Sequence, residues 1–397
     1  MTKIDSPLAD EAGAAIAAAR CTNVMQRAMG DAMLTMGVEE EFLLLGPDGA
    51  VVPSAPYVAR LARSGDQIKP EFLAYQLETA TSVCTRLDQL RSELVRLRSR
   101  AADAARRAGA SLVAVGAPPY AAGPLGAVTD ETRYRDLAGH FPGAVVAGSS
   151  CACQVHVGVP DRDLAVEVLA RIRPWLPALL ALTVNSPYAG DRDTGWASYR
   201  FHLQQRWPTF RPPGAWAGAE RYDRVVRSLV GTGAALDDGA VYFLARLSSR
   251  YPTVEVRVAD ACLTAEDTVF FAAVVRALVA TLIEDARRNI TTLPIPTGVV
   301  DAHLMTAAHG QVRIRQGRSP DGSSPVAAGA VARLMAKVSP ALSAWGDAEE
   351  VFHHLDRLRH EGTGADRQRR AWQRAGTAER FVDFLAAATA GTAAAHK

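Results

Sequence analysis

Three consecutive glutamates, Glu39, Glu40 and Glu41, follow a glycine and a valine and precede the apolar residues 42–45. Because side chains alternate between the faces of a β-strand, we expect Glu39 and Glu41 on one face and Glu40 on the other. Two carboxylates roughly 7 Å apart repel by about 2.4 kcal/mol at an effective dielectric near 20. A hard divalent cation between them would remove this cost, since carboxylate oxygens suit Mg²⁺ or Mn²⁺. Glu40 points away and is expected to tolerate substitution better than its neighbours.

Three further segments alternate apolar residues with glutamine, glutamate, histidine or arginine. The polar positions are Gln76 and Glu78 in 75–79, Gln154 and His156 in 154–159, and Glu255 and Arg257 in 253–258. For any one segment, a sheet that is dry on one side and solvated on the other explains the pattern as well. Ordinary solvated faces also favour lysine and threonine, however, whereas these segments offer metal-ligand and phosphate-binding groups. The joint pattern therefore favours a functional face.

Several common motifs are absent from the sequence. It has no G-x-x-x-x-G-K-[ST] segment, no G-x-G-x-x-G after a predicted strand and no G-x-S-x-G segment. The pair Cys151 and Cys153 is too closely spaced for a zinc knuckle and is interpreted as packing thiols. A nucleotide, if bound, would have to be held through metal ions and arginines.

The composition indicates a globular protein with a sizeable core, since 48% of its 397 residues are hydrophobic. The formal net charge is only +2 and the arginines are interspersed with acids, which argues against nucleic-acid and membrane partners. Five irregularly spaced cysteines favour reduced thiols. With neither a signal-peptide pattern nor a run approaching 18 apolar residues, we expect a cytoplasmic protein without a membrane span.

The elements that must position these side chains indicate a single α+β domain. We expect strands over 34–45, 75–79, 111–115, 154–159 and 253–258, and helices over 87–107, from about 161 to before Asn185, and from Thr264 to about 288. Residues 186–220 are rich in Pro, Gly, Trp and Arg and are interpreted as an active-site loop region. We expect an Ala-rich leader over 1–33, partly helical or disordered, a catalytic domain over 34–389 and a tail over 390–397.

Six segments in a fixed order resemble the type 2 glutamate-cysteine ligase family, also called carboxylate-amine ligases. They are GVEEEF at 37–42, QLE at 76–78, QVHVG at 154–158, NSP at 185–187, TGWASYR at 194–200 and TVEVRVAD at 253–260, with GTGADRQR at 362–369 as a late addition. The resemblance covers residues 34–385. It implies a glutamine synthetase-like fold, in which a curved antiparallel β-sheet packed with helices forms the active-site face.

The same resemblance implies a reaction in which ATP phosphorylates a carboxylate and an amine attacks the acyl phosphate to give an amide. Mg²⁺, with Mn²⁺ as an alternative, would lie between ATP and the carboxylate. The metal positions implied are Glu39, Glu41, Glu78, His156 and Glu255. No protein nucleophile is required, because the substrate carboxylate attacks; the general base is not assigned.

Further roles are implied position by position. Arg257 would meet the transferring phosphoryl group, with Arg200 and Glu255 completing the catalytic set, because cations stabilise the charge that develops on phosphoryl oxygens. Arg200 and Arg246 would assist the phosphates of ATP or the substrate carboxylate. Arg133, Tyr134 and Gln154 are the substrate-binding candidates.

One segment departs from the family pattern. In 304–310, Ala308 or His309 stands where the family would carry an arginine. The resemblance therefore leaves open which acid, glutamate or another amino acid, is joined to which amine. A specialised amide synthetase of small-molecule biosynthesis is an alternative on the same scaffold, and a metal-dependent hydrolase or phosphotransferase is another. The partners expected are a small-molecule acid and amine, and the resemblance suggests a homodimer.

Overall fold

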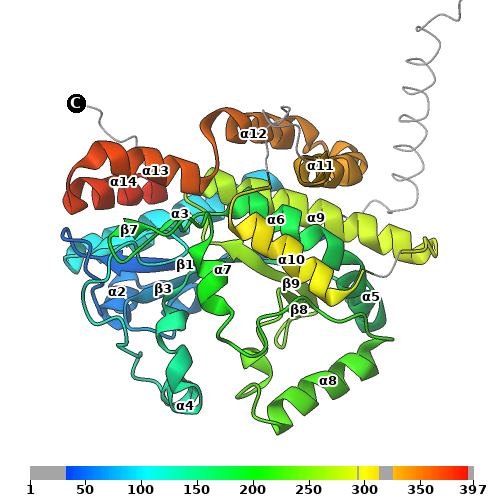
Figure 1. Ribbon diagram of the computed structural model, residues 1–397, viewed down its shortest axis with the longest axis horizontal. Helices are drawn as coiled ribbons and strands as arrows, with labels where there is room; N and C mark the ends of the chain where they lie inside the picture. Colours follow the sequence, from blue (N-terminus) through cyan, green and yellow to red (C-terminus); the bar gives the residue numbers. More distant parts are fainter. Residues whose placement is uncertain (1–32, 293–294, 313–324, 392–397) are drawn as a thin grey trace, which may run out of the picture.

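The computed structural model describes residues 33–292, 295–312 and 325–391. Residues 1–32 of the expected leader and most of the expected tail lie outside these residues. The described part combines an antiparallel sheet with many helices (Figure 1), so the predicted α+β class is confirmed.

The main sheet has the strand order β2-β3-β1-β5-β9-β8, with β4 pairing to the end of β1, and all pairs are antiparallel. Its strands are β1 (Met36–Leu45), β2 (Ile68–Pro70), β3 (Gln76–Ala80), β4 (Ser111–Val113), β5 (Ala152–Gly158), β8 (Ala245–Leu247) and β9 (Thr253–Asp260). A small hairpin joins β6 (Tyr188–Ala189) to β7 (Arg192–Asp193). Each predicted strand is present, and the four with polar faces are neighbours in one sheet.

Helices form two layers on one side of the sheet. The described helices are α2 (Ala55–Ala62), α3 (Leu87–Arg107), α4 (Thr132–His140), α5 (Arg162–Ile172), α6 (Leu176–Thr183), α7 (Tyr199–Gln204), α8 (Ala219–Gly231), α9 (Ala265–Arg287), α10 (Thr297–Ala308), α11 (Pro325–Trp345), α12 (Ala348–Glu361), α13 (Gly364–Ala375) and α14 (Ala378–Ala390). Helices α3, α6 and α9 pack near the sheet, α11 to α13 lie beyond them, and α14 contacts both α3 and β4, whereas α4 and α8 extend on the opposite side (Figure 1). None of the described helices is long and apolar enough to cross a bilayer.

Apolar alternation explains this layering. The valines of β5 and β9, among them Val155, Val157 and Val256, are fully buried on the side where α9 packs against the sheet. Helix α9 begins at the predicted Thr264 with a capping box, in which Thr264 Oγ1 accepts from the Asp267 backbone N–H and Asp267 accepts from the Thr264 N–H. Four cysteines of the described chain are free and buried, in agreement with packing thiols.

The prediction of one uninterrupted helix from about 161 to before Asn185 is wrong. Helix α5 ends at Ile172, a 3₁₀ turn spans Arg173–Trp175, and α6 begins at Leu176. Pro174 and Pro177 explain the break, because a proline lacks the amide hydrogen of an interior helical residue and crowds the preceding turn.

The expectation for Glu40 also needs correction. Its carboxylate does point away from Glu39 and Glu41, but it is 1% exposed and forms two hydrogen bonds with the guanidinium of Arg98, at 2.6 and 2.9 Å. Thr268 donates a third, at 2.6 Å. A buried ion pair that loses one partner leaves an uncompensated charge, so Glu40 is a structural residue and not an incidental one.

Candidate active site

The polar face of the sheet is largely buried, with Glu39, Glu41 and Arg257 partly exposed. Gln76, Gln154 and Glu255 are each at most 3% exposed, and His156 is 8% exposed. A simple solvated face is therefore excluded for these strands. Buried polar groups of this kind require partners or a ligand.

Glu39, His156 and Glu255 come together from β1, β5 and β9. One ligand atom from each lies within 4.8 Å of the other two. His156 and Glu255 are direct cross-strand partners, and Thr253 Oγ1 lies 3.0 Å from His156 Nδ1. His156 Nε2 is buried without a hydrogen-bond partner in the described chain, and it lies 3.7 Å from Glu39 Oε2, beyond hydrogen-bond range. Two carboxylates and an unsatisfied imidazole nitrogen fit a divalent cation.

The two carboxylates of this cluster favour the ionised form. Burial opposes ionisation of Glu39, but the neighbouring His156 outweighs it and holds the pKa of Glu39 below its usual value. Burial likewise opposes ionisation of Glu255, whereas Arg246, Arg257 and His156 bring the pKa of Glu255 well below normal. Ionised carboxylates are the form that binds a metal ion.

Two arginines flank Glu255. Arg246 donates Nε to Glu255 Oε2 at 2.9 Å and Nη2 to Oε1 at 3.1 Å, and its Nη1 is used by the carbonyls of Gly239 and Val241. Arg257 pairs with Glu255 Oε1 and with Gln154 Oε1. Arg246 is therefore committed to orienting Glu255. Arg257 lies on β9, as Glu255 does, and lines the cleft beside the cluster.

This cleft combines acids, arginines and aromatic rings. Its lining includes Glu41, Glu71, Arg200, Arg257, Gln204, Phe72, Trp207, Phe210 and Tyr242. Charged groups of both signs beside aromatic walls can orient a ligand that carries an ammonium group and a carboxylate or phosphate.

Glu41 lies in the cleft, apart from the three-residue cluster. Its carboxylate accepts from Gln154 Nε2 and from the Ala152 backbone N–H, both at 2.7 Å. Burial and the negative charge of Glu71 raise the pKa of Glu41 to about 7. Gln154, the third substrate-binding candidate, thus bridges Glu41 and Arg257.

Glu78 lies directly across from Glu41, on β3. Lys69 Nζ is 2.9 Å from Glu78 Oε1. Burial, followed by the charges of Glu39 and Glu71, raises the pKa of Glu78 well above normal. The structure thus gathers three of the five predicted metal ligands in one cluster; the metal roles of Glu41 and Glu78 stay predictions.

Arg200 is buried at the edge of the cleft. Its Nη1 and Nη2 donate to the carbonyls of Val258 and Arg257, both at 3.2 Å, and its Nε is buried without a partner in the described chain. Burial lowers the pKa of Arg200, although an arginine remains charged. Arg200 therefore braces the backbone of Arg257, and its Nε–H is not used within the described chain.

The other two substrate-binding candidates, Arg133 and Tyr134, lie on α4. Arg133 forms a half-exposed ion pair with Asp237 at 2.8 Å, whereas the hydroxyl of Tyr134 donates to Glu71 Oε2 at 3.0 Å. Glu71 and Tyr242 were missed from the sequence. They lie outside the alternating strand segments, so no periodic signal marked them.

The atypical segment 304–310 supports a loop next to the cleft. The Ala308 carbonyl accepts from the backbone N–H groups of Ala197 and Ser198, at 2.8 and 2.9 Å. The ring of His309 stacks on Trp196 with centroids 3.6 Å apart. Where the family would carry an arginine, this chain therefore has Ala308, whose carbonyl holds the backbone of the loop, and His309, whose imidazole stacks on Trp196.

Comparison with known proteins identifies relatives of the whole described fold. The model of a family described as glutamate-cysteine ligase family 2 matches residues 35–383. A protein provisionally named glutamate-cysteine ligase 2 from Salinispora tropica is 44% identical over 354 residues, covering 88% of this chain and 93% of its own. A similarly named protein, 2-2, of Mycolicibacterium vanbaalenii is 44% identical over 363 residues, covering 90% and 98%.

Solved structures support the fold. A bifunctional glutathione synthetase from Pasteurella multocida superimposes with a TM-score of 0.68 at 16% identity, covering 95% of this chain and 54% of its own. A glutamate-cysteine ligase from Francisella tularensis, solved with AMP, gives a TM-score of 0.64 at 13% identity, covering 90% and 88%. At such low identities these matches establish a shared architecture, which confirms the predicted fold.

Proposed function

Because the chain belongs to the glutamate-cysteine ligase family 2, we propose that its buried polar face activates a carboxylate as an acyl phosphate at the expense of ATP and then joins it to an amine. Family membership makes the protein an ATP-dependent, amide-forming carboxylate-amine ligase. The finer proposal rests on the cluster of Glu39, His156 and Glu255 and on Arg257, which pairs with Glu255 and also lines the charged cleft.

The phosphate end of the site lies at β9. Arg257 would stabilise the transferring phosphoryl group, and Arg200, which lines the same cleft, would assist. Glu39, His156 and Glu255 would hold Mg²⁺ or Mn²⁺, which when bound neutralises phosphate charge. Arg246 keeps the Glu255 carboxylate oriented. No side chain has to attack, because the substrate carboxylate does so.

In this proposal the amino group of a substrate lies beside Glu71. This half-buried carboxylate accepts from Tyr134, faces the cleft beside Phe72 and Tyr242, and has no ion-pair partner among the described residues. A carboxylate without its own cation, next to aromatic faces, suits a substrate ammonium group. We therefore infer that at least one substrate is an amino acid, with glutamate as the first candidate acid.

The test uses ATP, Mg²⁺ and pooled amino acids and amines, with ADP and new amide masses as readouts. The proposal expects ADP to form only when an acid and an amine are both present, and hydroxylamine to trap the activated acid as a hydroxamate. Cleavage of an amide without ATP would contradict it and favour the hydrolase alternative. A pool that includes non-proteinogenic acids also tests for a specialised amide synthetase, the alternative raised by segment 304–310.

Replacement of Arg257 tests the phosphate end. We expect Arg257→Ala to lower kcat/KM for ATP by about 10³-fold or more, because an arginine at a transferring phosphoryl group contributes on that order. Arg227→Ala, at an exposed position of α8, is the control and should behave as wild type. Unchanged ATP turnover in Arg257→Ala would show that the phosphate site lies elsewhere.

A further inference from the structure

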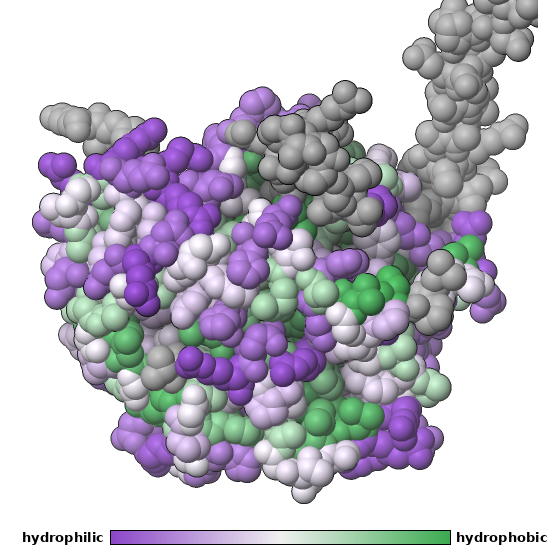
Figure 2. Space-filling model, viewed as in Figure 1, coloured by the Kyte–Doolittle hydropathy of each residue, from purple (hydrophilic) through white to green (hydrophobic). Residues whose placement is uncertain are grey.

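The N-terminal turn of α13 reaches into the interior, although the helix lies in the outer layer of the molecule. Hydrophilic side chains gather on the surface over α13 and α14 (Figure 2). Gly364, Ala365 and Gln368 are nevertheless buried, and Gln368 is 1% exposed. Its Nε2 donates to the backbone oxygen and to the side-chain oxygen of Asn185, at 2.8 and 2.7 Å. One buried amide group therefore directs its donors to a single residue 183 positions away.

Asn185 also forms hydrogen bonds at the end of β9. Its backbone N–H donates to Asp260 Oδ2 at 2.8 Å, and its Nδ2 donates to the carbonyls of Ala114 and Ala261, at 2.9 and 2.7 Å. Asn185 is thus held by α13 on one side and by the strand that carries Arg257 on the other.

Asp260 in turn holds the loop that carries Arg200. The hydroxyls of Ser186 and Ser198 both donate to Asp260 at 2.7 Å, and the Arg200 backbone N–H donates to Ser186 Oγ at 3.1 Å. Arg200 Nη1 lies 3.8 Å from Asp260 Oδ1. A continuous buried chain of hydrogen bonds therefore runs from Gln368 to Arg200.

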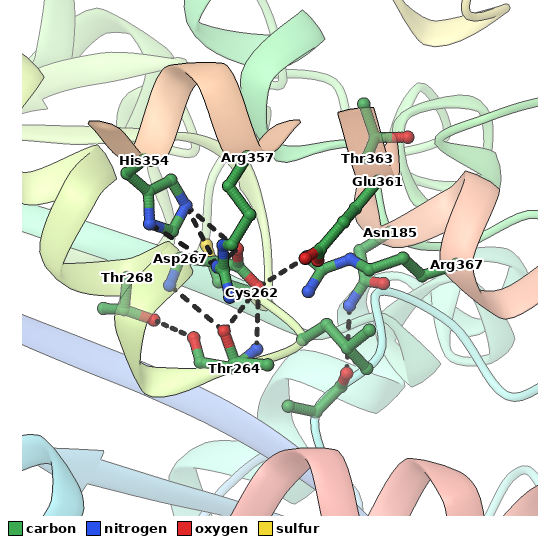
Figure 3. Close-up of polar contacts among 12 residues, drawn as sticks. Asn185, Cys262, Thr264, Asp267, Thr268, His354, Arg357, Glu361, Thr363 and Arg367 are labelled. Carbon is green, nitrogen blue, oxygen red and sulfur yellow. Dashed lines mark hydrogen bonds and ion pairs between the residues drawn. The ribbon is translucent and has the colours of Figure 1, made fainter. Parts of the chain in front are cut away.

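The neighbours of Gln368 fix α13 in two other places. Arg367 pairs with Asp267 at 2.6 Å, where His354 and Arg357 also converge on the start of α9 (Figure 3). Arg369 pairs with Asp193 at 2.7 Å and donates to the Trp196 carbonyl at 2.8 Å. Three consecutive side chains of α13 thus contact the start of α9, Asn185 and the hairpin that precedes Arg200.

The close approach requires a glycine at position 364. A Cβ placed on Gly364 would lie 2.2 Å from Asn185 Oδ1, far inside van der Waals contact. Any side chain there would push α13 away from Asn185 or displace the amide that Gln368 binds.

We propose that Gln368 and Gly364 are positioning residues, through which the C-terminal helix α13 sets the place of Arg200 in the active site. This inference rests on the proposed function for the role of Arg200. The coupling between α13 and the loop at 185–201 can be measured without any activity.

The experiment compares Gln368→Ala and the volume-conserving Gln368→Met with Gln373→Ala. Gln373 lies on the same helix but is exposed, so it is the matched control. By hydrogen–deuterium exchange, we expect peptides over 185–201 to exchange faster in both Gln368 variants and at the wild-type rate in Gln373→Ala. Gly364→Ala should act in the same direction. Wild-type exchange of these peptides in folded Gln368→Ala and Gln368→Met would overturn the proposal.

Kinetics separates positioning from simple loss of folded protein. A misplaced Arg200 should raise the KM for ATP and lower kcat/KM by about 10- to 100-fold, whereas loss of folded protein would lower only the apparent kcat. A wild-type KM for ATP in the Gln368 variants would contradict positioning. If the wild-type protein formed no ADP with any acid and amine, the proposed function would fail, and the exchange result would still decide whether α13 holds the loop.

Discussion

Glu39 and Glu40 are neighbours in sequence, but their carboxylates have opposite environments. On the helix side of the sheet, Glu40 accepts two hydrogen bonds from Arg98 and one from Thr268. On the cleft side, the recorded partner of Glu39 within the described chain is the His156 imidazole, 3.7 Å away. A carboxylate whose hydrogen bonds are completed by the protein serves the fold, whereas one that stays ionised without such partners is ready for a ligand.

Among the variants that test this difference between Glu40 and Glu39, Arg98→Met should have the largest effect. It leaves Glu40 buried and uncompensated, so the free energy of unfolding should fall by about 3–5 kcal/mol. The double variant Arg98→Met with Glu40→Leu should regain most of that loss, because both buried charges are then gone. Urea denaturation measures both variants. A double variant as unstable as Arg98→Met would show that the ion pair does more than compensate charge.

Glu39→Gln should instead reduce activity and leave stability nearly unchanged. We expect ATP turnover to fall by about 100-fold, because a metal ligand is lost, while the free energy of unfolding changes by less than about 0.5 kcal/mol. Glu40→Gln is the matched control on the other face, and it should lower stability while leaving the cleft residues in place. Titration with Mn²⁺ followed by paramagnetic relaxation supplies a second measurement. Wild-type Mn²⁺ affinity in Glu39→Gln would place the metal elsewhere.

The local pattern was enough to predict which glutamates share a face, because the pleat of a strand is set by adjacent residues. It could not predict that Arg98, 58 positions from Glu40, completes that side chain, because only packing of α3 against the sheet decides it. The break at Pro174 was readable from proline chemistry but was overridden by the apolar periodicity around it. Glu71 had no signal, since a loop carboxylate acquires a role only when strands and loops converge.

Glu41, on the cleft side of the sheet, should make the stability of the protein depend on pH. The pKa of Glu41 is raised to about 7 by burial and by Glu71, so the folded state holds a proton that the unfolded state releases near pH 4.5. Without metal ions, stability should therefore fall as pH rises from about 4.5 to 7. Glu41→Gln should remove this component, which we expect to be about 1–3 kcal/mol. Denaturation of both proteins in chelator across this range is the measurement, and parallel profiles would contradict the raised pKa.

On the helix side, Asp267 should instead make stability rise with pH, and this is the smallest of the expected effects. Burial opposes ionisation of Asp267, but Arg367, His354 and Arg357 hold the pKa of Asp267 well below normal. Its stabilising contribution is therefore complete above the unfolded pKa, near 4, and is lost as pH falls below it. Between pH 5 and 3 the wild type should lose stability more steeply than Asp267→Asn, which keeps a side chain of the same size and has no charge to lose. Equal slopes would mean that this carboxylate is not a charged anchor for α12 and α13, and the contrast between the two sides of the sheet would then rest on Glu40 and Glu39 alone.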